Sequence, residues 1–469
     1  MNSSTILKLA SCLFVSGMAA SALAESPAAP AVAAKSVPAA FRPALQKALA
    51  ADGALGIPSA TDSSAWLEQK VSADDGTYLG AFGWSFAMEG DTALIGAYYQ
   101  TIGANSFQGA VYVFTESNGV WTQTQELTAS DGAGGDNFGT SVAIDGDTVL
   151  IGAPSVAVGS NLNVGAAYVF TRSGGTWIQG QKLVADDGAA SSTFGISVAV
   201  RGSMTLIGAH GAAINGQNSQ GAVYAFTASG GTWSQAQKLV ASDGVASDQF
   251  GQQLSLDAHG TTVVIGSDQA TYADSFPGTG AAYVFNLQGD TWTQTQRLEA
   301  DDGQLADYFG RWTAIQGSTI VIGAPASPDS GGNPFMGSAY VFTESGGTWT
   351  QTQKLTADDG ISGDFFADAV AIAGNTILIG APGATIGGNP FVGAAYVYSF
   401  DGASWNQTDK IVPSDGAYGD EFGYAVALRD DLTALVGSPH PTDDGSGSTG
   451  AAYFYMNDTI FASGFEATP

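Results

Sequence analysis

Four short β-strands are predicted by the alternation of apolar and polar residues between positions 138 and 183. Residues 138–144 form the first strand, and the Asp-Gly pair at 145–146 is a tight turn, because type I′ hairpins need positive φ at both central positions. Residues 149–154 are almost continuously apolar, which is typical of a strand covered on both faces. Residues 165–170 form a third strand. Residues 177–183 are mostly polar, as in an edge strand.

This pattern recurs along the chain with a fixed period. A tryptophan begins each polar strand, at steps of 55 to 59 residues: Trp66, Trp121, Trp177, Trp233, Trp292, Trp349 and Trp405. A phenylalanine keeps the same period at the first strand: Phe82, Phe138, Phe194, Phe250, Phe309, Phe366 and Phe422. A fixed period means one supersecondary unit copied and stacked, and seven four-stranded copies close into a ring. We therefore predict an all-β fold, a seven-bladed β-propeller of four-stranded antiparallel blades.

The two ends of the repeat region complement each other. Residues 66–71 are an outer strand with no inner strands before it. The last copy runs through residues 422–428, 432–439 and 451–455 and stops without an outer strand. The N-terminal strand is therefore expected to complete the C-terminal blade, which removes free sheet edges.

The remaining segments divide the chain further. Residues 1–24 have the pattern of a signal peptide: Lys8, an apolar run and the small-x-small site Ala22-Leu23-Ala24. Residues 25–62 form an Ala/Pro-rich linker, 63–456 the propeller and 457–469 a short C-terminal tail. Cys12 is the single cysteine and lies in the signal, so the mature chain has no disulfide. We expect an exported protein, placed in the periplasm, outside the cell or on the surface of a bacterium.

Charge narrows the classes of partner. The chain has 43 Asp and Glu against 14 Lys and Arg, a net charge of -29, which argues against nucleic acid or anionic membrane. No segment after the signal is long and apolar enough for membrane insertion. Charged residues make up only 12% of the chain and hydrophobic ones 44%, which suits a packed, turn-rich β protein. We expect a monomer that binds a protein or glycan ligand.

Three short motifs resemble a known repeat. Phe138-Gly139, Gly152-Ala153-Pro154 and the strand at 165–170 are similar to the FG-GAP repeat, which builds the seven-bladed propeller of integrin α-subunit heads and of many bacterial exported proteins. Looser versions of the middle motif are Gly96-Ala97-Tyr98, Gly208-Ala209-His210, Gly266-Ser267-Asp268 and Gly437-Ser438-Pro439. The resemblance covers residues 63–456 and implies the fold, but a propeller hosts many functions.

Metal binding is one candidate property. Integrin-type repeats carry a calcium loop between the first two strands, but the corresponding turn here has two to four residues and cannot surround Ca²⁺. The loops that lead into each first strand are acidic instead. Each has an Asp before Gly: Asp75, Asp131, Asp187, Asp243, Asp302, Asp359 and Asp415. Five copies add a second carboxylate: Asp136, Asp248, Asp307, Asp364 and Asp420. These carboxylates either bond nearby backbone N–H groups or form a rim that binds Ca²⁺ weakly.

A second candidate site is the position two residues after each phenylalanine. It varies freely among the copies: Trp84, Thr140, Ile196, Gln252, Arg311, Asp368 and Tyr424. Variation within a fixed frame is where ligand-specific chemistry is placed, although a tolerant surface position varies in the same way. The candidate ligand-binding residues are Trp84, Gln252, Arg311, Trp312, Asp368 and Tyr424.

Signals for catalysis are weak. His210, His259 and His440 lie in separate loops, and no nucleophile motif stands in its required context. We therefore interpret the protein as a non-catalytic binding or adhesion scaffold, secreted or surface-exposed, whose rim loops meet a protein or glycan partner. Aromatic residues in those loops are candidate anchors: Phe107, Phe276, Phe335 and Phe391. The alternative is a polysaccharide-active hydrolase or lyase that uses rim carboxylates.

Overall fold

The computed structural model describes residues 66–270, 278–328, 332, 334–440 and 449–457. The chain divides into two compact units, 1–57 and 58–469, and all described residues belong to the second. The predicted signal, the whole linker, the tail after Asn457, and Phe276 lie outside the described residues. Within the described part, every regular element is a strand, so no helix there has the length and apolarity to cross a membrane.

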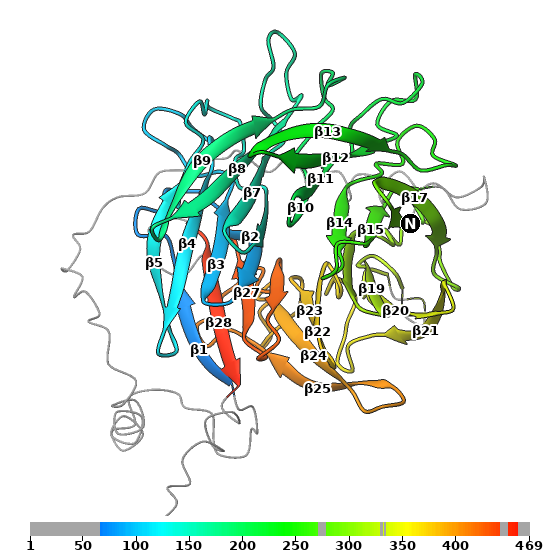
Figure 1. The fold of residues 1–469 in the computed structure, drawn as a ribbon. Helices are drawn as coiled ribbons and strands as arrows, with labels where there is room; N and C mark the ends of the chain where they lie inside the picture. Colours follow the sequence, from blue (N-terminus) through cyan, green and yellow to red (C-terminus); the bar gives the residue numbers. More distant parts are fainter. Residues whose placement is uncertain (1–65, 271–277, 329–331, 333, 441–448, 458–469) are drawn as a thin grey trace, which may run out of the picture. The chain divides into compact units, whose positions relative to one another are not determined.

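Seven antiparallel four-stranded sheets follow one another around a ring, with inner strands toward the centre (Figure 1). The inner strands are β2 (Phe82–Glu89), β6 (Ser141–Asp145), β10 (Val198–Arg201), β14 (Gln253–Leu256), β18 (Trp312–Gln316), β22 (Ala369–Ala373) and β26 (Val426–Leu428). The second strands are β3 (Thr92–Ala97), β7 (Thr148–Ala153), β11 (Met204–Ala209), β15 (Thr262–Ser267), β19 (Thr319–Ala324), β23 (Thr376–Ala381) and β27 (Ala434–Ser438).

The other two strands of each blade lie farther out. The third strands are β4 (Ala110–Ser117), β8 (Ala166–Ser173), β12 (Ala222–Ser229), β16 (Ala281–Gln288), β20 (Ser338–Ser345), β24 (Ala394–Phe400) and β28 (Ala451–Asn457). The outer strands are β5 (Val120–Leu127), β9 (Thr176–Leu183), β13 (Thr232–Leu239), β17 (Thr291–Leu298), β21 (Thr348–Leu355), β25 (Trp405–Ile411) and β1 (Trp66–Val71). Blade 1 is β2 to β5, and the blades are numbered in chain order to blade 7.

The predicted closure is confirmed. β1 pairs antiparallel with β28, from Trp66 opposite Asn457 to Val71 opposite Ala452, so the outer strand of blade 7 comes from the N-terminal side of the ring. In blades 1 to 6 a β-bulge interrupts the pairing of third and outer strands, as between Val113 and Phe114. β1 pairs with β28 in continuous register and has no bulge, so the closing strand reaches its lysine one residue sooner.

The predicted start of the inner strands is wrong in most blades. In blade 2 the strand was expected from position 138, but β6 begins at Ser141. Asn137 and Gly139 have φ of 59° and 89°, and positive φ is incompatible with an extended strand. The Phe-Gly pair is therefore part of a turn that leads into the strand, and only β2 begins at its phenylalanine.

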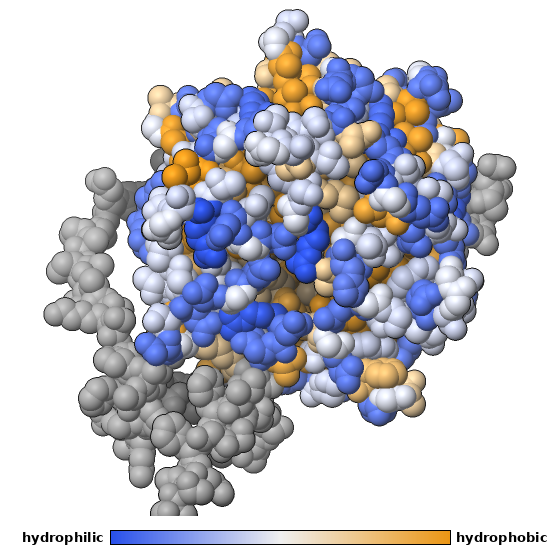
Figure 2. Space-filling model, in the orientation of Figure 1, coloured by the Kyte–Doolittle hydropathy of each residue, from blue (hydrophilic) through white to orange (hydrophobic). Residues whose placement is uncertain are grey.

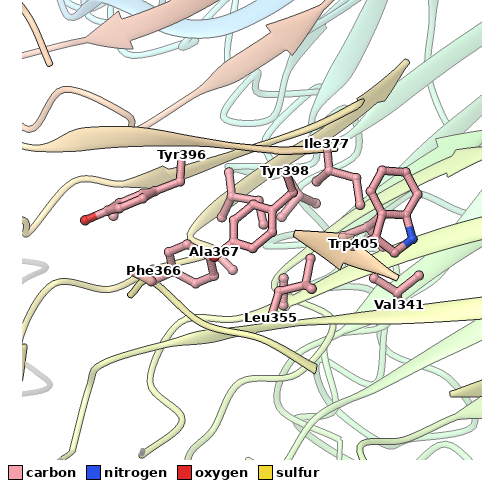
Figure 3. Packing of buried hydrophobic residues seen from close by; sticks show 14 of the residues in the cluster. Val341, Leu355, Phe366, Ala367, Ile377, Tyr396, Tyr398 and Trp405 are labelled. Carbon is pink, nitrogen blue, oxygen red and sulfur yellow. The ribbon is translucent and has the colours of Figure 1, made fainter. Parts of the chain in front are cut away.

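The hydrophobic core lies between neighbouring blades. One cluster joins Val341 and Leu355 of blade 5 to Phe366, Tyr398 and Trp405 of blade 6, and Figure 3 shows these side chains packed together. The ring of Phe366 is 6.1 Å from that of Tyr398 at an interplanar angle of 67°, an edge-to-face contact. Such a pair is worth about 0.5–1.5 kcal/mol beyond the area it buries.

Two glycines of the repeat meet at six of the seven contacts between blades. A Cβ at Gly152, in the second strand of blade 2, would overlap the carbonyl oxygen of Gly195 in blade 3. Gly165 has φ of 87° and lies equally close to the backbone of Phe194. Only glycine permits such close approach of two main chains, so these positions fix how tightly the blades pack.

Glutamine side chains join the outer strands of neighbouring blades. Gln125 Nε2 donates to the carbonyl of Trp177 at 2.7 Å, and Trp177 N–H donates back to Gln125 Oε1 at 2.8 Å. Six junctions share this pair of bonds, through Gln69, Gln125, Gln181, Gln237, Gln296 and Gln353. At the junction of blades 6 and 7 Asp409 takes the place of glutamine and accepts a hydrogen bond from Trp66 Nε1 at 2.6 Å.

We expect deletion of residues 63–72 to lower the melting temperature sharply. The deletion removes β1, exposes the edge of β28 and leaves Asp409 and Asp415 without their partners on Trp66 and Lys70. Thermal unfolding followed by circular dichroism is the measurement, with deletion of the ten residues 25–34 as the control. A synthetic peptide of residues 63–72 added in trans should restore part of the loss. An unchanged melting temperature would contradict the closure.

Candidate functional site

Side chains of the inner strands enclose two cavities at the centre of the ring. The lower cavity, about 400 Å³, is lined mainly by apolar residues such as Val200 and Leu256, with Arg201 and Asp257 at its edge. The upper cavity, about 250 Å³, is lined by the positions that follow each Phe-Gly pair. Six of the seven variable positions line it: Trp84, Thr140, Ile196, Gln252, Arg311 and Tyr424. Trp312 lines it as well.

Arg311 is the charged centre of the upper cavity. Its Nη1 lies 3.4 Å from Asp268 Oδ2 and its Nε lies 3.7 Å from Asp368 Oδ1. Asp368 does not line the cavity but reaches it through this contact. Burial raises the pKa of Asp368, opposed by the positive charge of Arg311. The two carboxylates hold Arg311 in place. Because 31% of its side chain is exposed, Arg311 remains accessible to a ligand.

Gln252 has a fixed orientation in the same cavity. Its Oε1 is hydrogen-bonded to His210 Nδ1 from blade 3. Burial lowers the pKa of His210, although the bond to Gln252 and the charge of Asp268 act in the other direction. His210 is therefore neutral near pH 7, and its role is to position the amide of Gln252.

Aromatic side chains form the opposite wall. The ring of Trp84 lies 4.2 Å from that of Tyr98 and 4.6 Å from that of Tyr424. Tyr99 extends this group outward, with its ring 3.8 Å from Tyr98 and 4.9 Å from Phe107. The wall therefore runs from the upper cavity to the rim of blade 1.

Three residues of this site were missed by the sequence analysis: Tyr98, His210 and Asp268. Each occupies the third position of the Gly-Ala-Pro motif, where four other blades have Pro154, Pro325, Pro382 or Pro439. Each contacts a variable position, Trp84, Gln252 or Arg311. The sequence marks these three positions, because each has another residue in place of proline. Which side chains they contact, however, depends on how the blades are placed around the ring.

The Asp before Gly in the loops between blades, here called the interblade loops, has a structural partner. In blade 5, Asp302 accepts hydrogen bonds from Tyr340 Oη at 2.8 Å and Lys354 Nζ at 2.6 Å. Burial raises its pKa, but the bonds from Lys354 and Tyr340 outweigh burial, so the pKa is lowered overall. The same lysine pairs join Asp131, Asp187, Asp359 and Asp415 to Lys182, Lys238, Lys410 and Lys70, and Arg297 pairs with Asp243.

Each carboxylate of the second set has a backbone partner. Each accepts the backbone N–H of the residue three positions earlier, at 2.6–2.9 Å: Asp136, Asp248, Asp307, Asp364 and Asp420. Ca²⁺ needs six to eight oxygens around it. Among the described residues, no group of three or more His, Cys, Asp or Glu side chains is arranged to hold a metal ion. The geometry thus agrees with the turn-forming interpretation, and weak Ca²⁺ binding stays a prediction without structural support.

The predicted aromatic anchors differ in exposure. Phe107 and Phe391 are 41% and 37% exposed in the loops between second and third strands, here called the middle loops. Phe335 is half-buried and packs against Phe365, with ring centroids 5.8 Å apart. The first two are therefore available at the rim, and Phe335 packs against the interblade loop that leads into blade 6.

A family model described as the FG-GAP repeat matches seven segments: 66–114, 121–170, 177–226, 233–285, 292–342, 349–398 and 405–455. The chain belongs to the FG-GAP repeat family. It is also similar to integrin alpha-2 of Mus musculus, 32% identical over 123 residues. That similarity covers 24% of this chain and 10% of the integrin, so the chain spans a small part of the relative it matches.

One FG-GAP blade has no basic residue at the position of these lysines and Arg297. In blade 1 the equivalent position is Glu126, while Asp75 accepts a hydrogen bond from Tyr112 Oη at 2.9 Å as in the other blades. Burial, followed by the negative charge of Asp75, raises the pKa of Glu126. Two carboxylates therefore lie near each other where the other blades have an ion pair.

We expect Glu126→Lys to raise the free energy of unfolding at neutral pH by about 0.2–1 kcal/mol, the worth of an exposed ion pair. The new ammonium takes the place that Lys182 has beside Asp131 in blade 2. The gain should shrink as salt is added. Lys182→Glu is the matched control and should lose stability. A neutral or destabilising Glu126→Lys at low salt would contradict the equivalence of the blades.

Two aspartates of one loop should respond oppositely to pH. Burial raises the pKa of Asp307 from 3.8 to about 6, against the bond from Gln304 N–H. A raised carboxyl pKa favours the fold at low pH, and that stability is lost as pH rises through about 6. Asp307→Asn should therefore gain about 1–2 kcal/mol relative to the parent between pH 4 and pH 7, after solvent screening.

Asp302→Asn is the control of opposite sign. The pKa of Asp302 is lowered overall, so its contribution is present above its unfolded value near 3.8 and is lost as pH falls below it. The variant should be less stable than the parent at neutral pH, and the difference should vanish in acid. Denaturant unfolding across pH is the measurement, and parallel trends for the two variants would refute the assignment.

Proposed function

We propose that the protein is an exported, non-catalytic binding or adhesion scaffold whose interblade and middle loops meet a protein or glycan partner. Its acidic charge argues against nucleic acid as that partner. Placement in the periplasm, outside the cell or on a bacterial surface follows from the predicted signal. The FG-GAP repeats and the similarity to an integrin α-subunit support this reading.

The observation that carries the proposal is a ring of exposed apolar residues on the rim. Antiparallel blades place the interblade loops and the middle loops at the same end of the ring. Apolar side chains are exposed in these loops at Tyr78 (67%), Leu162 (69%), Leu305 (58%), Ile361 (51%) and Tyr418 (63%). Figure 2 shows one face of the molecule, on which hydrophobic patches interrupt a mostly hydrophilic surface. Apolar groups within a polar surround are typical of a binding surface.

A polysaccharide hydrolase or lyase is the second candidate. Asp268 and Asp368 both lie beside Arg311, and the raised pKa of Asp368 is the kind of perturbation that general acids show. Both carboxylates are, however, paired with the same guanidinium. A two-carboxylate mechanism needs one protonated and one free group, so the arrangement favours binding.

We expect Leu305→Asp combined with Ile361→Asp to weaken partner binding at least about tenfold, because two charges enter an apolar contact. The assay is binding of the purified protein to immobilised glycans and bacterial surface proteins. Ile178→Asp is the matched control, since Ile178 is 55% exposed on the outer strand β9, away from the rim. Equal loss in both variants would contradict a rim site. Turnover of polysaccharides that Asp368→Asn abolishes would favour the enzyme.

A further inference from the structure

We propose that the upper cavity binds one neutral or amino-sugar ring, the terminal unit of a glycan. This inference rests on the proposed function and names the ligand class of its central site. Trp84 and Tyr424 supply the apolar contact, and Gln252 and Arg311 supply the hydrogen bonds.

The size of the upper cavity limits its ligand. Its volume of about 250 Å³ is below the roughly 300–1,000 Å³ of pockets that hold drug-sized molecules. Val142, Val198 and Leu254 line both cavities, so the floor between them is apolar. A single ring with one apolar face fits this space, and an extended chain of sugars does not.

The aromatic wall suits the apolar face of a sugar. Trp84 is packed between Tyr98 and Tyr424 at interplanar angles of 41° and 36°, which limits its motion. It is nevertheless half-buried and lines the cavity, so part of the indole is available to a ligand. An aromatic ring that is already ordered supplies contact area at little cost in conformational entropy.

The polar wall requires a group that accepts hydrogen bonds. The guanidinium of Arg311 has five N–H donors, of which the contacts to Asp268 and Asp368 use Nη1 and Nε. Asp268 is only 2% exposed and does not line the cavity, so it holds Arg311 in place without meeting the ligand itself. A sugar hydroxyl accepts from Arg311, whereas a lysine or arginine of a protein partner only donates. This contrast favours a sugar over a charged protein side chain.

Local charge selects among sugars. Asp268, Asp368 and Glu421 outnumber Arg311, the cation beside them, and both Glu421 and Asp268 add to the raised pKa of Asp368. A uronic acid, a sialic acid or a phosphate would meet net repulsion in a partly desolvated site. A neutral sugar meets none, and an amino sugar gains attraction.

The experiment titrates the full-length protein with methyl glycosides of glucose, galactose, mannose and N-acetylglucosamine, and with glucosamine and glucuronate. Calorimetry and tryptophan fluorescence report binding. We expect saturable binding of at least one neutral or amino sugar, with a dissociation constant on the order of millimolar for one ring. Glucuronate should bind at least about tenfold more weakly.

Variants place the sugar in the cavity. Trp84→Ala should abolish saturable binding, and Trp84→Phe should retain it within about threefold, because a ring is kept. Melting temperatures separate loss of binding from loss of fold. Ile178→Asp is the control and should bind sugar as the parent does.

The other outcomes would overturn the sugar inference, its location in the cavity or the proposed function. If no sugar binds saturably but a surface protein binds through the rim, the sugar inference is overturned and the proposed function stands. Sugar binding that survives Trp84→Ala in a folded protein overturns the location. If neither sugars nor surface proteins bind, the proposed function fails as well.

Discussion

The close approach of two main chains at every blade contact, through two glycines at six of the seven contacts, is the constraint on which the structure depends. The glycine of the second strand in one blade lies against the carbonyl that follows the phenylalanine of the next, as Gly152 does against Gly195. A side chain on either main chain would push the blades apart and leave gaps in the interblade core, and interiors tolerate few such gaps. Blade 6 tests the rule, because Ala367 replaces the glycine after Phe366 and adopts φ of 69°. Its methyl group is accepted only with a strained backbone.

Because this frame is fixed, chemistry is confined to the positions that it leaves open. The residue after each Phe-Gly pair lies at the start of an inner strand, and the residue after each Gly-Ala pair lies at the end of a second strand, at the same end of the ring. Neither takes part in the contact between glycines. Their side chains meet across blade boundaries, as His210 of blade 3 meets Gln252 of blade 4. The repeated residues thus build the ring, and the residues that differ among the blades line the cavity or contact the residues that do.

Much of the fold was predictable because its determinants are local and repeated. The spacing of Trp66 and its six counterparts gave the blades, and the unequal ends gave the closure. The inner-strand starts were misplaced because the backbone turns at Asn137 and Gly139, which periodicity alone does not reveal. The bulge of the outer strands is visible in the sequence, because the spacing from Trp66 to Lys70 is one residue shorter than that from Trp177 to Lys182.

The candidate site was predictable in position and less so in content. Variation after Phe-Gly correctly drew attention to Trp84 and Arg311, which line one cavity. Asp268 was missed because its partnership with Arg311 joins residues 43 positions apart in different blades. The acidic loops invited a metal interpretation because composition counts carboxylates, whereas their hydrogen bonds depend on backbone placement. The carboxylate of Asp307 accepts a hydrogen bond from the N–H of Gln304, and the number of acidic residues does not reveal this bond.

The closing strand also fixes the order of events when the chain is made. Tyr455 Oη of β28 donates to Glu68 Oε2 of β1 across 387 residues of sequence, so β1 cannot pair until β28 has been synthesised. Contacts of such separation form late, after the loop between them has been closed. Until then both ends of the ring present unpaired edges, and a chain cut short of its last blade keeps them permanently. Only a chain that contains both β1 and β28 can cover the edge of β28, and a truncated chain leaves that edge open to proteases and to other chains.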